Sequence, residues 1–119
     1  MLKPIAVMAA IAAPAAALAG QADVVAAEIT RHGGAWRVEA TIAHADEGWE
    51  HFANAFRVTG PDGTVYGTRK LLHPHVTEQP FTRSLTGVEI PPDVKTVTVE
   101  AHDNVHGWGG ATVELEVRP

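Results

Sequence analysis

The chain has 119 residues and a net charge of −5 at pH 7, with 14 acidic residues against nine basic ones. This length predicts a single domain, and the acidic balance argues against nucleic acid or an anionic membrane surface as a partner. The sequence contains no cysteine, which excludes disulfide bonds, lipid attachment through a cysteine and thiolate ligands for soft metal ions.

The first 19 residues predict a signal peptide. Met1–Lys3 gives a short basic start, residues 5–18 form an alanine-rich apolar run, and residues 17–19, Ala-Leu-Ala, match the small-x-small pattern of signal-peptidase sites. The run is too short and too rich in alanine for a membrane-spanning helix. We therefore expect cleavage before Gly20, a periplasmic location and one mature domain of residues 20–119. Both methionines lie in the removed segment, so this domain contains no sulfur.

Apolar and polar residues alternate through most of the remaining chain, as they do in half-buried strands. Seven strands are predicted in chain order, at 23–31, 36–43, 50–59, 64–72, 81–90, 96–102 and 112–117. Glycine, proline and aspartate mark the turns between several of them. This pattern predicts an all-β fold, a seven-stranded antiparallel immunoglobulin-like β-sandwich. A cupredoxin-like Greek-key barrel is the alternative.

Histidine is unusually frequent in this chain, and its frequency indicates a binding site. Seven occur in the mature domain, roughly three times what average composition suggests. If consecutive strands alternate in direction, the connections at 44–51, 72–80 and 102–110 lie at one end of the sandwich. Six histidines fall in or beside these connections: His44, His51, His73, His75, His102 and His106. His32, in a Gly-Gly turn, belongs to the other end.

The expected strand order indicates which of these histidines lie closest together. In an immunoglobulin-like sandwich the seventh, sixth, third and fourth strands share one sheet in that order. His51 and His102 then have the same outward parity on neighbouring strands, where opposite side chains lie about 5 Å apart. The predicted metal ligands are His51, His102, His106 and one of His73 and His75. Only one of the last two is expected because an x-Pro-x bend is stiff, and His44 ranks lower because it leaves from the other sheet.

Neutral imidazole suits Cu(II) and Zn(II). Acidic residues near the same connections would neutralise the ion or orient the imidazoles; they are Asp46, Glu47, Glu50, Glu78 and Asp103. The lack of sulfur excludes a blue-copper centre and a methionine-lined Cu(I) carrier. We therefore expect a periplasmic protein that carries or senses Cu(II) or Zn(II).

Other interpretations of the same end stay open. Trp49 and Trp108 lie in its connections and would either anchor the core or form a platform for a partner protein or glycan. The histidines would then be solvated or capping residues. A small metallohydrolase or oxidoreductase with three histidines and an open position is a further alternative. The chain is short for a substrate pocket and lacks a His-Glu-x-x-His motif, which favours a protein without enzymatic activity.

Three segments resemble motifs of small exported bacterial proteins of uncharacterised function. They are HPHVTEQPFTRSL at 73–85, AHDNVHGWGG at 101–110 and GWEHFANAFRV at 48–58. The resemblance covers most of the mature domain and implies that the three segments act as one unit. It implies no particular activity. The likeness to immunoglobulin domains is architectural only, because the cysteine pair of antibody domains is absent.

Overall fold

The computed structural model describes residues 8–10 and 20–118. These residues form strands but no helix, and hence no helix able to cross a membrane. The strands are β1 (Met8–Ala10), β2 (Asp23–His32), β3 (Ala35–Ala43), β4 (Ala53–Thr59), β5 (Val65–Lys70), β6 (Phe81–Val88), β7 (Thr96–Asp103) and β8 (Gly107–Glu116).

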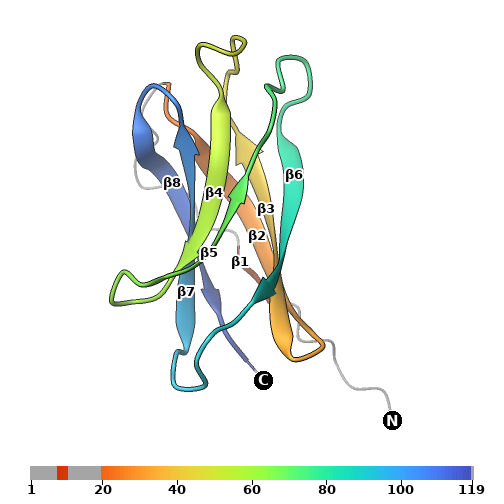
Figure 1. The fold of residues 1–119 in the computed structure, drawn as a ribbon, viewed down its shortest axis with the longest axis vertical. Helices are drawn as coiled ribbons and strands as arrows, with labels where there is room; N and C mark the ends of the chain where they lie inside the picture. Colours follow the sequence, from red (N-terminus) through yellow and green to blue (C-terminus); the bar gives the residue numbers. More distant parts are fainter. Residues whose placement is uncertain (1–7, 11–19, 119) are drawn as a thin grey trace.

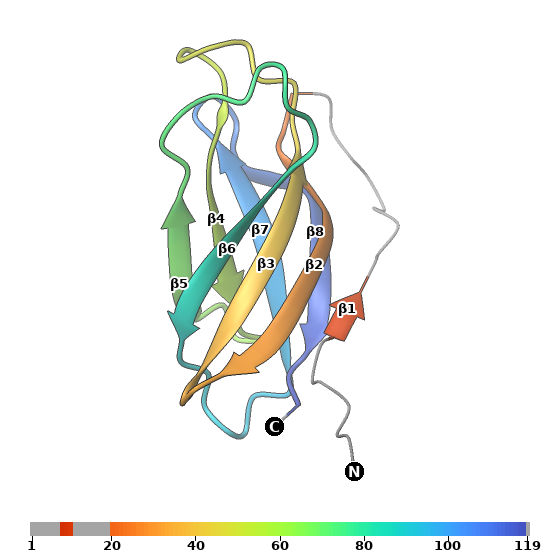
Figure 2. The ribbon, with the colours of Figure 1, turned by 90° about the vertical axis from the view of Figure 1, so that its right-hand side faces the viewer.

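The strands form two four-stranded antiparallel sheets that pack face to face (Figures 1 and 2). One sheet has the order β1-β2-β3-β6 and the other the order β5-β4-β7-β8. Strands β2 to β8 are the seven strands predicted from the alternation of apolar and polar residues. The predicted sandwich is confirmed, including the order in which the seventh, sixth, third and fourth predicted strands share a sheet.

β1 is an eighth strand that the sequence did not predict. It pairs with the edge of β2, with Met8 opposite Ile29 and Ala10 opposite Ala27. It lies inside the predicted signal peptide, whose remaining residues, 1–7 and 11–19, lie outside the described residues. The signal peptide, its cleavage before Gly20 and the domain limits therefore stay predictions.

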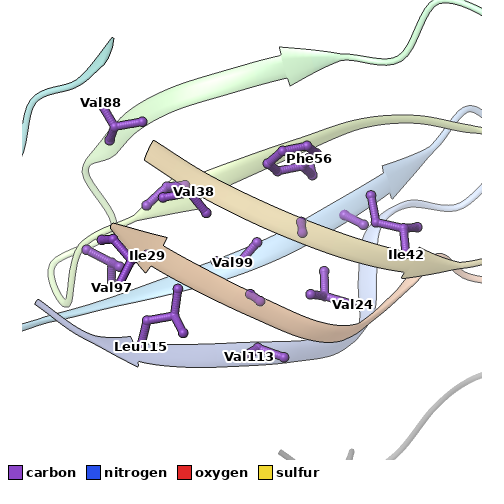
Figure 3. Packing of buried hydrophobic residues seen from close by; sticks show 14 of the residues in the cluster. Val24, Ile29, Val38, Ile42, Phe56, Val88, Val97, Val99, Val113 and Leu115 are labelled. Atoms are coloured by element: carbon purple, nitrogen blue, oxygen red, sulfur yellow. The ribbon is translucent and has the colours of Figure 1, made fainter. Parts of the chain in front are cut away.

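The core lies between the sheets and consists mainly of aliphatic side chains (Figure 3). β3 shows why the sequence folds this way, because Trp36, Val38, Ala40 and Ile42 are buried while the residues between them are partly exposed. Phe56 faces them from β4 and is fully buried. Each such Val, Ile or Phe side chain contributes about 1.5–3 kcal/mol when it is removed from water. These contacts fix which face of each strand points inward.

The connections that carry most of the histidines lie at one end of the sandwich, as predicted. The β3–β4 loop, the β5–β6 loop and the β7–β8 turn come together there, and the segment that leads into β2 starts at the same end (Figures 1 and 2). The β2–β3, β4–β5 and β6–β7 connections lie at the opposite end. The antiparallel frame thus gathers three segments that are distant in the sequence.

Truncation of the core tests this packing. Phe56→Ala should lower the free energy of unfolding by about 3–5 kcal/mol, because it leaves a cavity between the sheets. Leu72→Ala is the matched control, because Leu72 is 77% exposed, and it should change the value by less than about 0.5 kcal/mol. Urea unfolding followed by circular dichroism measures both. Equal losses for the two variants would contradict the packing described.

Candidate metal centre

Asp103 is the buried centre of the histidine-rich end. It is the last residue of β7, its side chain faces inward, and it is 0% exposed. Its Oδ1 accepts hydrogen bonds from the backbone N–H groups of Val105 at 2.7 Å and His106 at 2.6 Å. Burial acts to raise the pKa of Asp103, but the hydrogen bonds from the turn outweigh it and the pKa is lowered. Asp103 is therefore a buried anion at neutral pH.

His44 lies one residue beyond β3, and its side chain is 1% exposed. Its Nε2 lies 3.5 Å from Oδ2 of Asp103, and its Nδ1 lies 2.5 Å from Oδ1 of Asp46. Asp46 also accepts the backbone N–H groups of Ala53 at 3.0 Å and His75 at 2.7 Å. The Asp46 carboxylate accepts both of these hydrogen bonds. Nδ1 of His44 therefore carries a proton and donates it to the same carboxylate. Nε2 lies 3.0 Å from the carbonyl oxygen of Gly20 and faces Asp103 behind it.

His51 approaches the same carboxylate from the end of the β3–β4 loop. Its Nε2 lies 3.7 Å from Oδ1 of Asp103, its Nδ1 lies 3.0 Å from Oε1 of Glu47, and its side chain is 17% exposed. The pKa of His51 is raised, chiefly by the hydrogen bond to Glu47, whereas burial acts to lower it. The Gly20 carbonyl and the charges of Asp103 and Glu47 also raise this pKa. A tight turn in which the N–H of His51 donates to the carbonyl of Gly48 at 3.2 Å sets this position.

These three residues form a group that could hold a metal ion. One ligand atom from each of His44, His51 and Asp103 lies within 4.8 Å of the other two. Tetrahedral coordination with bonds of about 2.0–2.1 Å places ligand atoms about 3.4 Å apart, close to the Nε2–Oδ separations of 3.5 and 3.7 Å. Both Nδ1 atoms contact carboxylates, the arrangement that fixes the tautomer and ring orientation of metal-ligating histidines.

His106 lies at the outer edge of this group. Its Nδ1 is 3.2 and 3.1 Å from the two carboxylate oxygens of Asp103, and its ring centroid is 5.0 Å from that of His51. Its side chain is 37% exposed. The structure thus brings His106 beside His51, one of the ligands that the sequence predicted with it. Its closest contact there is with Asp103.

The structure does not pair His102 with His51: His102 faces outward as predicted, whereas His51 precedes β4 and its Nε2 lies 3.7 Å from the inward-facing Asp103. His102 and Asp103 are successive residues of β7, so their side chains point to opposite faces. Asp103 is the inward one, and His102 lies on the outer face, where its Nδ1 is 2.6 Å from Oδ1 of Asn54 and its ring packs against Trp108 at 4.8 Å. The sequence interpretation placed the site on the outer face, whereas the convergence occurs on the inner one.

His73 and His75 form a separate pair, with ring centroids 4.7 Å apart. His75 is buried and stacks on Phe81 at 3.9 Å. The Arg83 guanidinium, which can only donate, lies 2.9 Å from its Nε2, so that nitrogen is an occupied acceptor. Burial, together with the charge of Arg83 and His73, lowers the pKa of His75. His73 is exposed, with Nδ1 3.2 Å from the Pro74 carbonyl.

The two tryptophans have different surroundings. Trp49 is 66% exposed at the tip of the β3–β4 loop, with its ring 5.6 Å from Phe52. Trp108 lies on the outer face beside His102, and the Arg57 guanidinium sits 3.8 Å above its ring. Trp49 is thus an accessible indole, whereas Trp108 is held by a cation–π contact.

Sequence reasoning ranked His44 low and treated Asp103 only as a supporting carboxylate. A signal for Asp103 was present, because it has the same strand parity as Val97, Val99 and Ala101, which are all buried. An acidic residue with inward parity at a strand end indicates a buried charge that needs partners. His44 had the same inward parity as Ile42 on β3.

Comparison with known proteins gives one informative similarity. The chain is 37% identical over 97 residues to a protein of Halomicrobium mukohataei named "Putative lipoprotein". The match covers 81% of this chain and 47% of that protein, so the chain spans about half the length of its relative. No protein family and no solved structure matches the chain.

The environment of His75 predicts a specific pH dependence. Because its folded pKa is lowered, the unfolded chain binds the extra proton first as pH falls below about 6.5. The free energy of unfolding therefore falls as pH drops through the window between 6.5 and the lowered folded pKa. His75→Gln should remove this part of the slope in chelator-treated protein, as measured by urea unfolding from pH 7.5 to 5.

The same substitution at His32, the exposed last residue of β2, is the control and should leave the slope as in the unmodified protein. A slope that is identical in His75→Gln and the unmodified protein would show that this histidine is protonated equally in the folded and unfolded states.

Proposed function

We propose that this protein binds one divalent transition-metal ion, Cu(II) or Zn(II), through Nε2 of His44, Nε2 of His51 and the carboxylate of Asp103, and that it carries or senses this ion outside the cytoplasm. The observation that supports the proposal most strongly is the pair of imidazoles whose Nδ1 atoms each contact a carboxylate while their Nε2 atoms converge on a third, buried carboxylate.

The hydrogen-bond pattern favours a cation at this point. With Nδ1 donating to Asp46 or Glu47, each Nε2 carries either a lone pair or a second proton. The atoms around both Nε2 positions are oxygens, from Asp103 and from the Gly20 carbonyl. Two imidazolium rings with centroids 4.8 Å apart would repel each other. One divalent ion in place of the two protons would bind the two Nε2 lone pairs and the surrounding oxygens at the same time.

The donor set narrows the choice of metal. Two imidazole nitrogens and one carboxylate oxygen suit first-row transition metals, and the mature domain offers no sulfur. Fe(II) oxygenases use the same kind of donors, but the affinity of such sites rises from Fe(II) to Cu(II), and Zn(II) also binds tightly. We therefore favour Cu(II) and Zn(II). Three protein ligands leave coordination positions open, and the partial exposure of His51 gives a route for exchange of the ion.

Two observations support export. The N-terminal residues have the basic start, apolar run and small-residue cleavage pattern of a signal peptide. The similar protein of Halomicrobium mukohataei carries the name lipoprotein, which describes proteins attached to membranes outside the cytoplasm. We infer that this chain also acts outside the cytoplasm, and we assign the periplasm as its compartment.

A second candidate function is recognition of a partner protein through the same end. Large apolar side chains are exposed on its loops: Trp49, Leu72, Val76 and Val105. Exposed aromatic and aliphatic side chains of this kind are typical anchors of protein interfaces. Trp49→Ala would abolish capture of such a partner whereas a chelator would leave it intact, and the opposite pattern favours metal binding.

The metal proposal predicts uptake of about one equivalent of Cu(II) or Zn(II) by protein purified without a histidine tag. His44→Ala combined with His51→Ala should lower the affinity at least 100-fold, because two of the three donors are lost. Asp103→Asn should lower it at least tenfold. Isothermal titration calorimetry and elemental analysis measure these changes, with Fe(II) included under anaerobic conditions.

His102→Gln is the matched control. It removes a histidine from the outer face of β7 without touching the group, and it should bind metal as the unmodified protein does. Uptake that depends on His102 and not on His44 would contradict the proposed ligands, and absence of uptake of both Cu(II) and Zn(II) would reject the function.

A further inference from the structure

The backbone of Gly20 lies closer to the two imidazoles than Asp103 does. Its carbonyl oxygen is 3.0 Å from Nε2 of His44 and 3.1 Å from Nε2 of His51. The Gly20 oxygen and the two carboxylate oxygens of Asp103 thus lie around the two Nε2 atoms, with four Nε2–O separations of 3.0 to 3.7 Å. A main-chain oxygen thus lies beside both nitrogens that are proposed to bind the metal.

Gly20 is also the residue that the sequence places directly after the signal-peptidase site. Hydrolysis of the Ala19–Gly20 bond adds water, leaves a carboxylate on Ala19 and converts the amide nitrogen of Gly20 into an α-amine. An amide nitrogen has no lone pair available for a metal at neutral pH, whereas an amine does. The α-nitrogen of a residue lies about 3 Å from its own carbonyl oxygen, so the new amine is created at the edge of the imidazole pair.

The position of Gly20 is fixed by the residues that follow it. Gln21 Oε1 accepts the backbone N–H of Gly110 at 3.0 Å, Asp23 Oδ1 accepts that of Ala111 at 2.7 Å, and Ala22 is buried. These contacts attach the segment to β8 and do not involve residues before Gly20.

The backbone conformation favours glycine at this point. The φ of Gly20 is +88°, and a Cβ there would lie 2.8 Å from Cε1 of His106. The left-handed backbone conformation strongly favours glycine, and a larger residue would also require the His106 ring to move. The chain thus approaches the histidines through a residue without a side chain, so its main chain comes near their rings.

We propose that the processed N terminus completes the metal site, with the α-amine and carbonyl oxygen of Gly20 chelating the ion beside His44, His51 and Asp103. This inference rests on the metal-binding function proposed above. The ammonium form of the amine, with a pKa of about 7.7–8.0 in model peptides, releases its proton to solvent when the metal binds. The precursor offers only an amide at this position, so full affinity arises after export and cleavage.

The test compares one protein before and after scarless proteolysis. A soluble tag without histidine is fused directly to Gly20, so that cleavage changes only the Gly20 nitrogen from amide to amine. The described core residues lie between Ala22 and Val117, so this chain keeps the whole core. In the control fusion, cleavage leaves Leu18 and Ala19 in front of Gly20. Cu(II) affinity is measured by competition with a chelator of known affinity.

Cleavage that exposes Gly20 should raise the Cu(II) affinity at least tenfold, and the control cleavage should leave it unchanged. The electron paramagnetic resonance spectrum should gain coupling to one nitrogen in the first case only. Equal affinity before and after cleavage at Gly20 would overturn this inference and leave the proposed function standing. Absence of Cu(II) binding in every form, confirmed with Zn(II), would overturn both.

Discussion

A carboxylate that is fully removed from water needs donors or positive charge around it, because desolvation of a charge costs several kcal/mol. Asp103 is such a group, and the histidine-rich end is arranged around it. The β7–β8 turn supplies two backbone N–H groups, and the rings of His44, His51 and His106 approach from two loops. This one buried charge is compensated by the turn, by the path of the β3–β4 loop and by the orientation of the rings.

A second carboxylate links the remaining connection to the site. Asp46 contacts Nδ1 of His44 while it accepts the backbone N–H groups of Ala53 and His75. It therefore ties the β3–β4 loop to the start of β4 and to the β5–β6 loop. His75 acts here through its main chain, since its ring is engaged with Phe81 and Arg83. The three connections converge because carboxylates hold them together, and the imidazoles are placed by that network.

The sandwich explains why such a site can be both fixed and accessible. The buried faces of the two sheets set the strand ends, and hence the starting points of the loops. The site lies at the end of the core, so its inner members, Asp103 and His44, are removed from water while His51 and His106 reach the surface. A buried carboxylate with partly exposed imidazoles suits an ion that enters and leaves without unfolding the domain.

The sequence by itself determined the fold class, the seven strands β2 to β8, the order of one sheet and the end of the molecule that gathers the histidines. The strands and the gathering of the histidines follow from the two-residue period of strands and from the alternating direction of an antiparallel chain, which are local rules. The sheet order followed from the assumed immunoglobulin-like topology. The strand β1 had no such signal, since three residues are too few to show a period.

Only the tertiary structure decided which histidines meet. The sequence already indicated that His102 faces outward and Asp103 inward, but only the folded loops show that His44 and His51 turn toward the inward carboxylate. The contact of Gly20 with His44 and His51 also arises across segments that no local pattern connects. Residue type indicated the chemistry of this end of the domain, and burial between the sheets selected the atoms that come within reach of one another.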